Sequence, residues 1–185
     1  RIIHTQTFII IMQELPKRKI LRLENYNYSG NGCYFITICT YNKSHLFGRH
    51  NVGAIHESPV KHAKNRCIEL NLYGQIVENA ILKLPERYKE IEIINYIVMP
   101  THIHLLVSIN NDVNSERAIR ESPLQHSLLS KAMGYLKMNV SKEIHKQNPL
   151  IEVWQRGYID HIIRNQTDFE HHWNYIEYNA LKEYK

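Results

Sequence analysis

Two apolar runs, Ile93–Met99 and Leu105–Ile109, flank a short segment with the sequence PTHIH. Runs of this length and composition favour β-strands, and the proline between them marks a turn. The sequence therefore predicts a β-hairpin with strands at 90–99 and 102–109. Because side chains alternate between the faces of a strand, His102 and His104 are expected to share one face while Ile103 packs on the other. That arrangement suits joint binding of one metal ion by the two imidazoles.

The rest of the chain supplies further strands and helices in a regular order. A β-branched and aromatic run predicts a strand at 33–41, and residues 154–165 resemble a short strand-like connector. Apolar residues at helical spacing predict helices at 75–84 and 124–145, and a last helix from Thr167 onward. We expect Pro85 to end the first helix, and residues 42–70 to be irregular. The order β-α-β-β-α-β-α favours one α+β sandwich, an antiparallel sheet with helices packed on it.

Length and charge set the domain organisation and the class of partner. The chain has 185 residues, a formal charge of +5 and a pI of about 9.0. We expect a single domain over 33–185, with loop insertions near 49–70 and 110–123, after an N-terminal basic arm over 1–32. The arm carries cations and aromatic rings suited to phosphates and unpaired bases, with a simple basic tail as the alternative. Its candidate DNA-binding residues are Lys17, Arg18, Lys19, Arg22, Tyr26 and Tyr28.

The three cysteines and the hydropathy pattern indicate the compartment. Cys33, Cys39 and Cys67 form neither a Cys-x-x-Cys pair nor an even-numbered disulfide set, which favours a reducing cytoplasm. The sequence has no apolar run of about 20 residues, so we expect no membrane partner. Because Arg1 is not a natural start, residues 1–11 are a candidate extraneous segment, with Met12 as the candidate initiator.

The last predicted helix carries a second group of polar residues. Thr167 and Glu170 match a capping box, which would start the helix at Thr167. An apolar stripe then faces the sheet, consisting of Phe169, Trp173, Ile176 and Ala180. Tyr175 and Asn179 lie one turn apart on a flank of this stripe, together with His172 and Asp168. We expect Tyr178 to point to solvent.

These groups suit phosphodiester chemistry if they meet in space. A tyrosine hydroxyl is a weak nucleophile at neutral pH, but it becomes effective beside a divalent cation that polarises a phosphate. His102, His104 and Asn179 could hold such a cation with coordination positions left open, and Tyr175 would attack the phosphorus. Spacing alone leaves structural roles open for each of these residues.

Four ordered motifs resemble those of the REP-associated tyrosine transposases, within the single-tyrosine HUH superfamily (His, hydrophobic, His). The first is the histidine segment at 100–104 with its flanking runs, and the second is the strand at 33–41 with the following Leu46-Phe47-Gly48. The third is the signature at 154–165, WQRGYIDHIIRN, and the fourth is YIEYN at 175–179. Together they span about residues 18 to 182.

The resemblance implies a ferredoxin-like domain that cuts single-stranded DNA beside imperfect hairpins. It implies that Tyr175 forms a covalent 5′-phosphotyrosine and that His102, His104 and Asn179 bind Mg²⁺ or Mn²⁺. Arg156 and Arg164 fall in the third motif and become candidates for DNA phosphate contacts, with surface ion pairs as the alternative. His161 is expected to be a buried, hydrogen-bonded support, and His172 is a second support residue.

One position departs from the family pattern, and several functions remain open. The proline that usually follows the asparagine is Ala180 here, which permits a longer helix. The sequence favours a metal-dependent DNA endonuclease and strand-transferase. Its rivals are a domesticated hairpin-binding protein that no longer cuts, and a metallohydrolase that activates water while Tyr175 is structural. Monomer and homodimer are both open, as is whether the tyrosine acts on its own histidine pair or on a partner's.

Overall fold

A computed structural model describes residues 31–50, 68–110 and 127–182, and the side chains of 179–182 lie outside the described part. Its elements, in chain order, are β1 (Gly32–Cys39), the 3-10 helix η1 (Tyr41–Lys43), β2 (Gly48–His50), β3 (Ile68–Leu70), α2 (Leu72–Leu82), α3 (Leu84–Arg87), β4 (Ile91–Val98), β5 (His102–Ile109), α4 (Leu128–His145), β6 (Ile159–Ile163) and α5 (Gln166–Lys182). Residues 1–30 of the expected basic arm over 1–32, and most of the two expected insertions, fall outside these residues.

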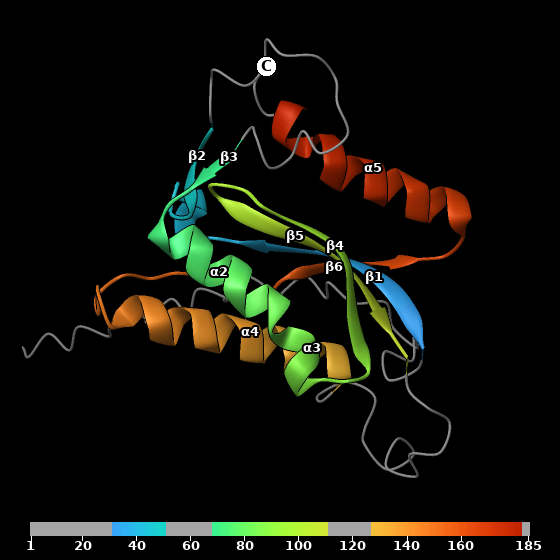
Figure 1. Cartoon of the computed structure of the whole chain (residues 1–185), viewed down its shortest axis with the longest axis horizontal. Helices are drawn as coiled ribbons and strands as arrows, with labels where there is room; N and C mark the ends of the chain where they lie inside the picture. The colour runs from blue at the N-terminus through green and yellow to red at the C-terminus, as the bar shows by residue number, and fades with distance from the viewer. Residues whose placement is uncertain (1–30, 51–67, 111–126, 183–185) are drawn as a thin grey trace, which may run out of the picture.

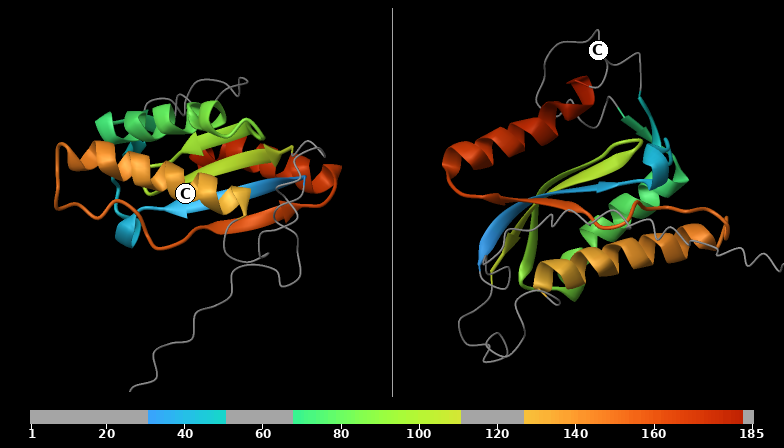
Figure 2. Two further views of the ribbon diagram at one scale, coloured as in Figure 1. Left: turned by 90° about the horizontal axis from the view of Figure 1, so that it is seen from below. Right: turned by 180° about the vertical axis from the view of Figure 1, so that it is seen from behind.

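A four-stranded antiparallel sheet forms the centre of the fold. Its strand order is β4-β5-β1-β6, and each neighbouring pair is antiparallel. Helices α2 and α4 cover one face, whereas α5 crosses the other (Figures 1 and 2). This order of strands and helices is the ferredoxin-like α+β sandwich, which confirms the expected fold class, with an added helix on the second face.

Alternation along the two central strands sorts the side chains between these faces. On β5, Ile103 and Leu105 are fully buried in the larger core under α2 and α4. The alternate residues His104 and Leu106 face α5, where Leu106 packs with the fully buried Ile176. The strand therefore fixes the histidines on the α5 face, as predicted.

Several predicted boundaries need correction. The 42–70 region is not wholly irregular, because β2 and β3 pair there in a small second sheet. Pro85 does not end the helical region, since it occupies the first turn of the short helix α3, where its missing N–H costs nothing. The long helix begins at Leu128, where the Ser127 side chain caps it.

The start of α2 packs tightly against the loop that leaves β1, and this contact requires a glycine. The Asn71 side chain caps the helix through Gly74 N and donates to Leu46 O, so helix and loop lie close together. A Cβ built on Gly74 would lie 2.1 Å from the carbonyl oxygen of Phe47.

We expect Gly74→Ala to lower the free energy of unfolding by about 1–3 kcal/mol or more, because backbone must move to admit the methyl group. Gly134→Ala is the matched control: it lies on an exposed turn of α4 with no atom within 4 Å of the added Cβ. That change should stabilise the protein by about 0.5–1 kcal/mol through helix propensity. Urea unfolding of both variants measures the difference, and equal stabilities would contradict the packing.

Candidate active site

The two histidines of β5 lie side by side on the α5 face of the sheet. The centroids of the His102 and His104 rings are 4.5 Å apart, with the ring planes at 72°. His104 is buried, with 4% of its surface exposed, and His102 is half-buried. The predicted pair therefore exists, and one of its members is enclosed by the protein.

Each imidazole is held by a threonine hydroxyl. Thr37 Oγ1 lies 2.9 Å from His104 Nδ1, across the β1–β5 ladder, and Thr101 Oγ1 lies 2.9 Å from His102 Nδ1. Such outer hydrogen bonds fix the tilt and the tautomer of a metal-binding histidine. The opposite nitrogen of His104, Nε2, is buried and has no hydrogen-bond partner among the residues that the structure describes. A buried nitrogen without a hydrogen-bond partner destabilises the folded state unless a ligand satisfies it. The lone pair of Nε2 therefore suits a metal ion.

His104 is kept in the form that binds metals. Burial, with smaller contributions from His102 and His172, lowers the pKa of His104 to about 3. Its imidazole is therefore neutral at physiological pH, and the neutral ring offers a lone pair to a cation.

Tyr175 of α5 lies against this histidine pair. Its ring centroid is 5.2 Å from that of His104, in an edge-on arrangement. Phe35 of β1 contacts both rings, stacked on His104 at 5.0 Å and edge-on to Tyr175 at 5.7 Å. Tyr178, by contrast, is 53% exposed, as the helical spacing predicted. The structure thus joins the tyrosine and the histidine pair, which lie some seventy residues apart in the sequence.

Two contacts hold α5 in this position over the sheet. Ile176, next to the tyrosine, is fully buried among Ile97, Met99 and Leu106. Glu177 accepts a 2.9 Å hydrogen bond from Asn95 Nδ2, and Asn95 lies at a bulge of β4 with 5% exposure. Sequence analysis missed both Asn95 and Thr37, because only the strand register shows what they face.

The beginning of α5 differs from the predicted capping box. The side chain of Asn165 accepts the hydrogen bond from Asp168 N at 2.9 Å, so Asn165 caps the helix. Glu170 instead accepts a hydrogen bond from the Gln166 side chain. Asn165 caps the helix two residues before the predicted Thr167 cap, which leaves Thr167 inside the first turn.

The apolar stripe of α5 is also narrower than expected. Phe169 and Ile176 pack on the sheet, but Trp173 is 37% exposed and its ring lies 6.0 Å from that of Phe169. A single helix packed on a sheet buries only the side chains that point directly at the sheet. Trp173 lies at the edge of that buried face. The helix does continue past Ala180 to Lys182, as the absence of proline predicted.

His161 is exposed rather than buried, which corrects the prediction, although it is hydrogen-bonded as expected. It lies on the edge strand β6, where one side of the strand has no neighbouring strand, and its side chain contacts the Asp168 carboxylate. His172 is partly buried, with its ring 4.5 Å from that of Phe35. His172 therefore borders the Phe35 ring, and His161 stacks on His172.

The remaining predicted residues are placed only in part. Arg156 and Arg164 are both exposed, and they lie before and after β6, at opposite ends of the strand. Asn179 belongs to α5, one turn after Tyr175, but its side chain lies outside the described residues. The six arm residues at 17–28 lie outside them as well.

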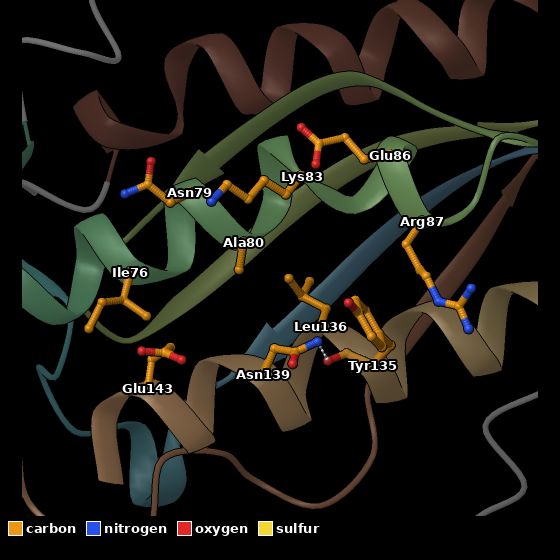
Figure 3. A pocket seen from close by; sticks show the side chains of 10 residues that line it. All are labelled: Ile76, Asn79, Ala80, Lys83, Glu86, Arg87, Tyr135, Leu136, Asn139 and Glu143. Carbon is orange, nitrogen blue, oxygen red and sulfur yellow. Dashed lines mark hydrogen bonds between the residues drawn. The ribbon is translucent and has the colours of Figure 1, made fainter. Parts of the chain in front are cut away.

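A groove on the other side of the sheet is separate from this site. It runs between α2 and α4 and carries both signs of charge, because Lys83, Arg87, Glu86 and Glu143 all line it (Figure 3). Neither the histidine pair nor Tyr175 lines it. Within the described ranges, no helix has the length and apolar character that crossing a membrane requires.

Comparison with known proteins identifies the relatives of this chain. No family model matches it. An uncharacterized protein of Haemophilus influenzae is 30% identical over 172 residues, covering 89% of this chain and 88% of that protein. A REP-associated tyrosine transposase of Escherichia coli is 27% identical over 109 residues, and the chain matches 54% of its length. A solved structure of a REP-associated tyrosine transposase bound to a REP hairpin has a TM-score of 0.52 at 20% identity, covering 88% of this chain and 73% of that one.

These matches define the family of the chain. It belongs to the same family as the Haemophilus influenzae protein, with which it aligns over nearly the full length of both. Its named homologues are REP-associated tyrosine transposases, and the solved transposase has the same fold, which confirms the resemblance inferred from the motifs.

Proposed function

We propose that the protein is a metal-dependent single-strand DNA endonuclease and strand-transferase that acts beside DNA hairpins. The observation that carries the proposal is the contact of Tyr175 with His104, next to His102. A phenol beside two imidazoles suits attack on a phosphodiester. The homologues named as transposases and the hairpin bound to the solved transposase support this choice of reaction and of DNA.

The residues present fit a divalent cation at the histidine pair. His104 offers its buried, unpartnered Nε2, and the threonine contacts fix both rings. His102 and His104 would hold the ion, with Asn179 as the proposed third ligand. Mg²⁺ or Mn²⁺, when bound, supplies polarisation of the scissile phosphate and neutralises charge on its oxygens.

The protein's own contribution is a positioned nucleophile. In the proposed reaction the Tyr175 oxygen attacks the phosphorus, a bond to it forms, and the bond between phosphorus and the 3′ oxygen breaks. The leaving strand takes up a proton as a free 3′ hydroxyl, which balances the proton that the phenol gives up. The product is a 5′-phosphotyrosine, an ester that keeps the free energy of the broken phosphodiester bond. A second 3′ hydroxyl can therefore attack this phosphorus, release the tyrosine and join two strands.

The structure also favours a tyrosine that acts on its own chain. Tyr175 and His104 of one chain are already in contact, so the site does not need a partner's helix. We therefore propose cis action, whether the protein is a monomer or a homodimer. Mixing Tyr175→Phe protein with His102→Ala protein should then give no restored activity, whereas restored activity would show exchange of helices between two chains.

The proposal is tested by covalent capture. The protein is incubated with Mn²⁺ and single-stranded oligonucleotides that carry the imperfect hairpins flanking its own gene, and the products are run on a denaturing gel. We expect a protein–DNA adduct that EDTA prevents. Hairpin binding without any adduct would support the binding-only alternative, and free 5′-phosphate ends from protein that carries Tyr175→Phe would support water as the nucleophile.

Thr37 is a positioning residue for this site and gives a graded prediction. Thr37→Val keeps the shape of the side chain but removes the hydroxyl that contacts His104 Nδ1. We expect Mn²⁺ affinity to fall about 10- to 100-fold, because outer-shell partners typically contribute that much. Isothermal titration with Mn²⁺ measures the effect directly. Unchanged affinity in a folded Thr37→Val protein would show that the ring needs no such support.

A further inference from the structure

Three potential metal ligands meet where β6 passes under the start of α5. His161 comes from β6, and Asp168 and His172 come from successive turns of α5. Their ligand atoms all lie within 4.8 Å of one another. The two imidazole rings are stacked, with centroids 4.6 Å apart and planes at 22°. The strand and the helix therefore bring together two nitrogen donors and a carboxylate.

The two separations between the Asp168 carboxylate and the histidine nitrogens are close to the spacing of ligands around a small tetrahedral ion. Asp168 Oδ2 lies 3.0 Å from His161 Nε2, and Asp168 Oδ1 lies 3.1 Å from His172 Nδ1. Metal–ligand bonds of 2.0–2.2 Å at tetrahedral angles put neighbouring donors about 3.3 Å apart. Only small side-chain shifts would separate the donors enough to admit an ion between them.

The charges and the exposure also suit a cation. Burial works against ionisation of Asp168, but hydrogen bonds from His161 and from Arg164 N outweigh it and lower the pKa of this carboxyl. The His161 side chain is 46% exposed, so an ion can reach the cluster from solvent. His172 Nδ1 also lies 2.9 Å from Asp168 O, and a bound ion would take the place of the proton shared in that contact.

We propose that His161, Asp168 and His172 form a second metal site, for Zn²⁺. Two imidazoles and one carboxylate are a donor set that zinc accepts, with water completing the coordination. The site shares no ligand with the histidine pair of β5, and the Phe35 ring contacts both His172 and His104. An ion there would tie α5 to β6 three residues before Tyr175. Zinc binding itself does not depend on the proposed DNA reaction.

Zinc titration of metal-free protein tests this site without DNA. The His102→Ala variant removes a ligand of the first pair and serves as the background. We expect it to bind one equivalent of Zn²⁺ by isothermal titration. Adding His161→Ala should weaken this binding at least about tenfold, since loss of even an outer-shell partner of a metal site costs 10- to 100-fold.

Two further variants keep the result interpretable. His145→Ala is the matched control, because His145 is an exposed histidine of α4, on the opposite face of the sheet, and does not belong to the cluster. It should change zinc affinity less than twofold. Asp168→Asn keeps the size of the side chain and should weaken binding as His161→Ala does, while circular dichroism reports the fold. The proposal is overturned if the His102→Ala background binds no zinc, or if His161→Ala and Asp168→Asn both bind it as tightly as that background.

Discussion

Tyr175→Phe is expected to lower the rate of formation of the covalent protein–DNA adduct by roughly 10⁴-fold or more. The substitution removes the nucleophilic oxygen and leaves the rest of the side chain in place. The phenyl ring can keep the edge-on contacts with His104 and Phe35, so the fold should survive. Hairpin binding, measured by mobility shift in EDTA, should remain within a few-fold of the wild type. The adduct itself is measured on denaturing gels with Mn²⁺ and the hairpin oligonucleotide.

Tyr178→Phe provides a matched control for this prediction. Tyr178 is on the same helix, three residues later, and is 53% exposed on the side away from the sheet. Removal of its hydroxyl should leave adduct formation unchanged within about twofold. A Tyr175→Phe protein that still forms the adduct while Tyr178→Phe does not would move the nucleophile to the exposed tyrosine and contradict the proposed geometry.

The histidine pair was predictable from sequence because its position depends on local alternation. A proline turn between two apolar runs defines the hairpin, and a two-residue period then places His102 and His104 together. The tyrosine was predictable for a similar reason, since helical spacing puts Tyr175 on the flank of a stripe that contains Ile176. Both inferences need only the repeat of side-chain directions along one strand or one helix.

Contacts between elements could not be predicted in this way. Thr37 supports His104 because β1 pairs with β5 in one particular register, and the sequence does not state that register. Asn95 reaches Glu177 only because β4 carries a bulge next to it. The exposure of His161 likewise follows from the position of β6 at the edge of the sheet.

Local signals can also compete, as two candidate caps do at the start of α5. Thr167 and Glu170 have the spacing of a capping box, yet Asn165 supplies the cap. Asparagine is at least as good a cap as threonine, so the motif alone could not decide. The same choice sets which side chains begin the helix, and it places Asp168 where both His161 and His172 can reach it.

His102→Ala is expected to reduce metal-dependent adduct formation by about 10²- to 10³-fold. The proposed cation contributes several kcal/mol of charge stabilisation in the transition state, and each 1.36 kcal/mol corresponds to a factor of ten in rate. His102 is the better position to change, because it is half-buried, whereas truncation of the buried His104 would also open a cavity.

The control for His102→Ala is His171→Ala, which removes an exposed imidazole from α5 and should leave the rate unchanged. Hairpin binding in EDTA should be the same for both variants, since neither substitution alters the nucleophile. Raising the Mn²⁺ concentration should partly restore the His102→Ala rate, because the weakened site is then filled by mass action. If His102→Ala cleaved at the wild-type rate in low Mn²⁺, the pair on β5 would not hold the catalytic ion, and the contact with Tyr175 would need another explanation.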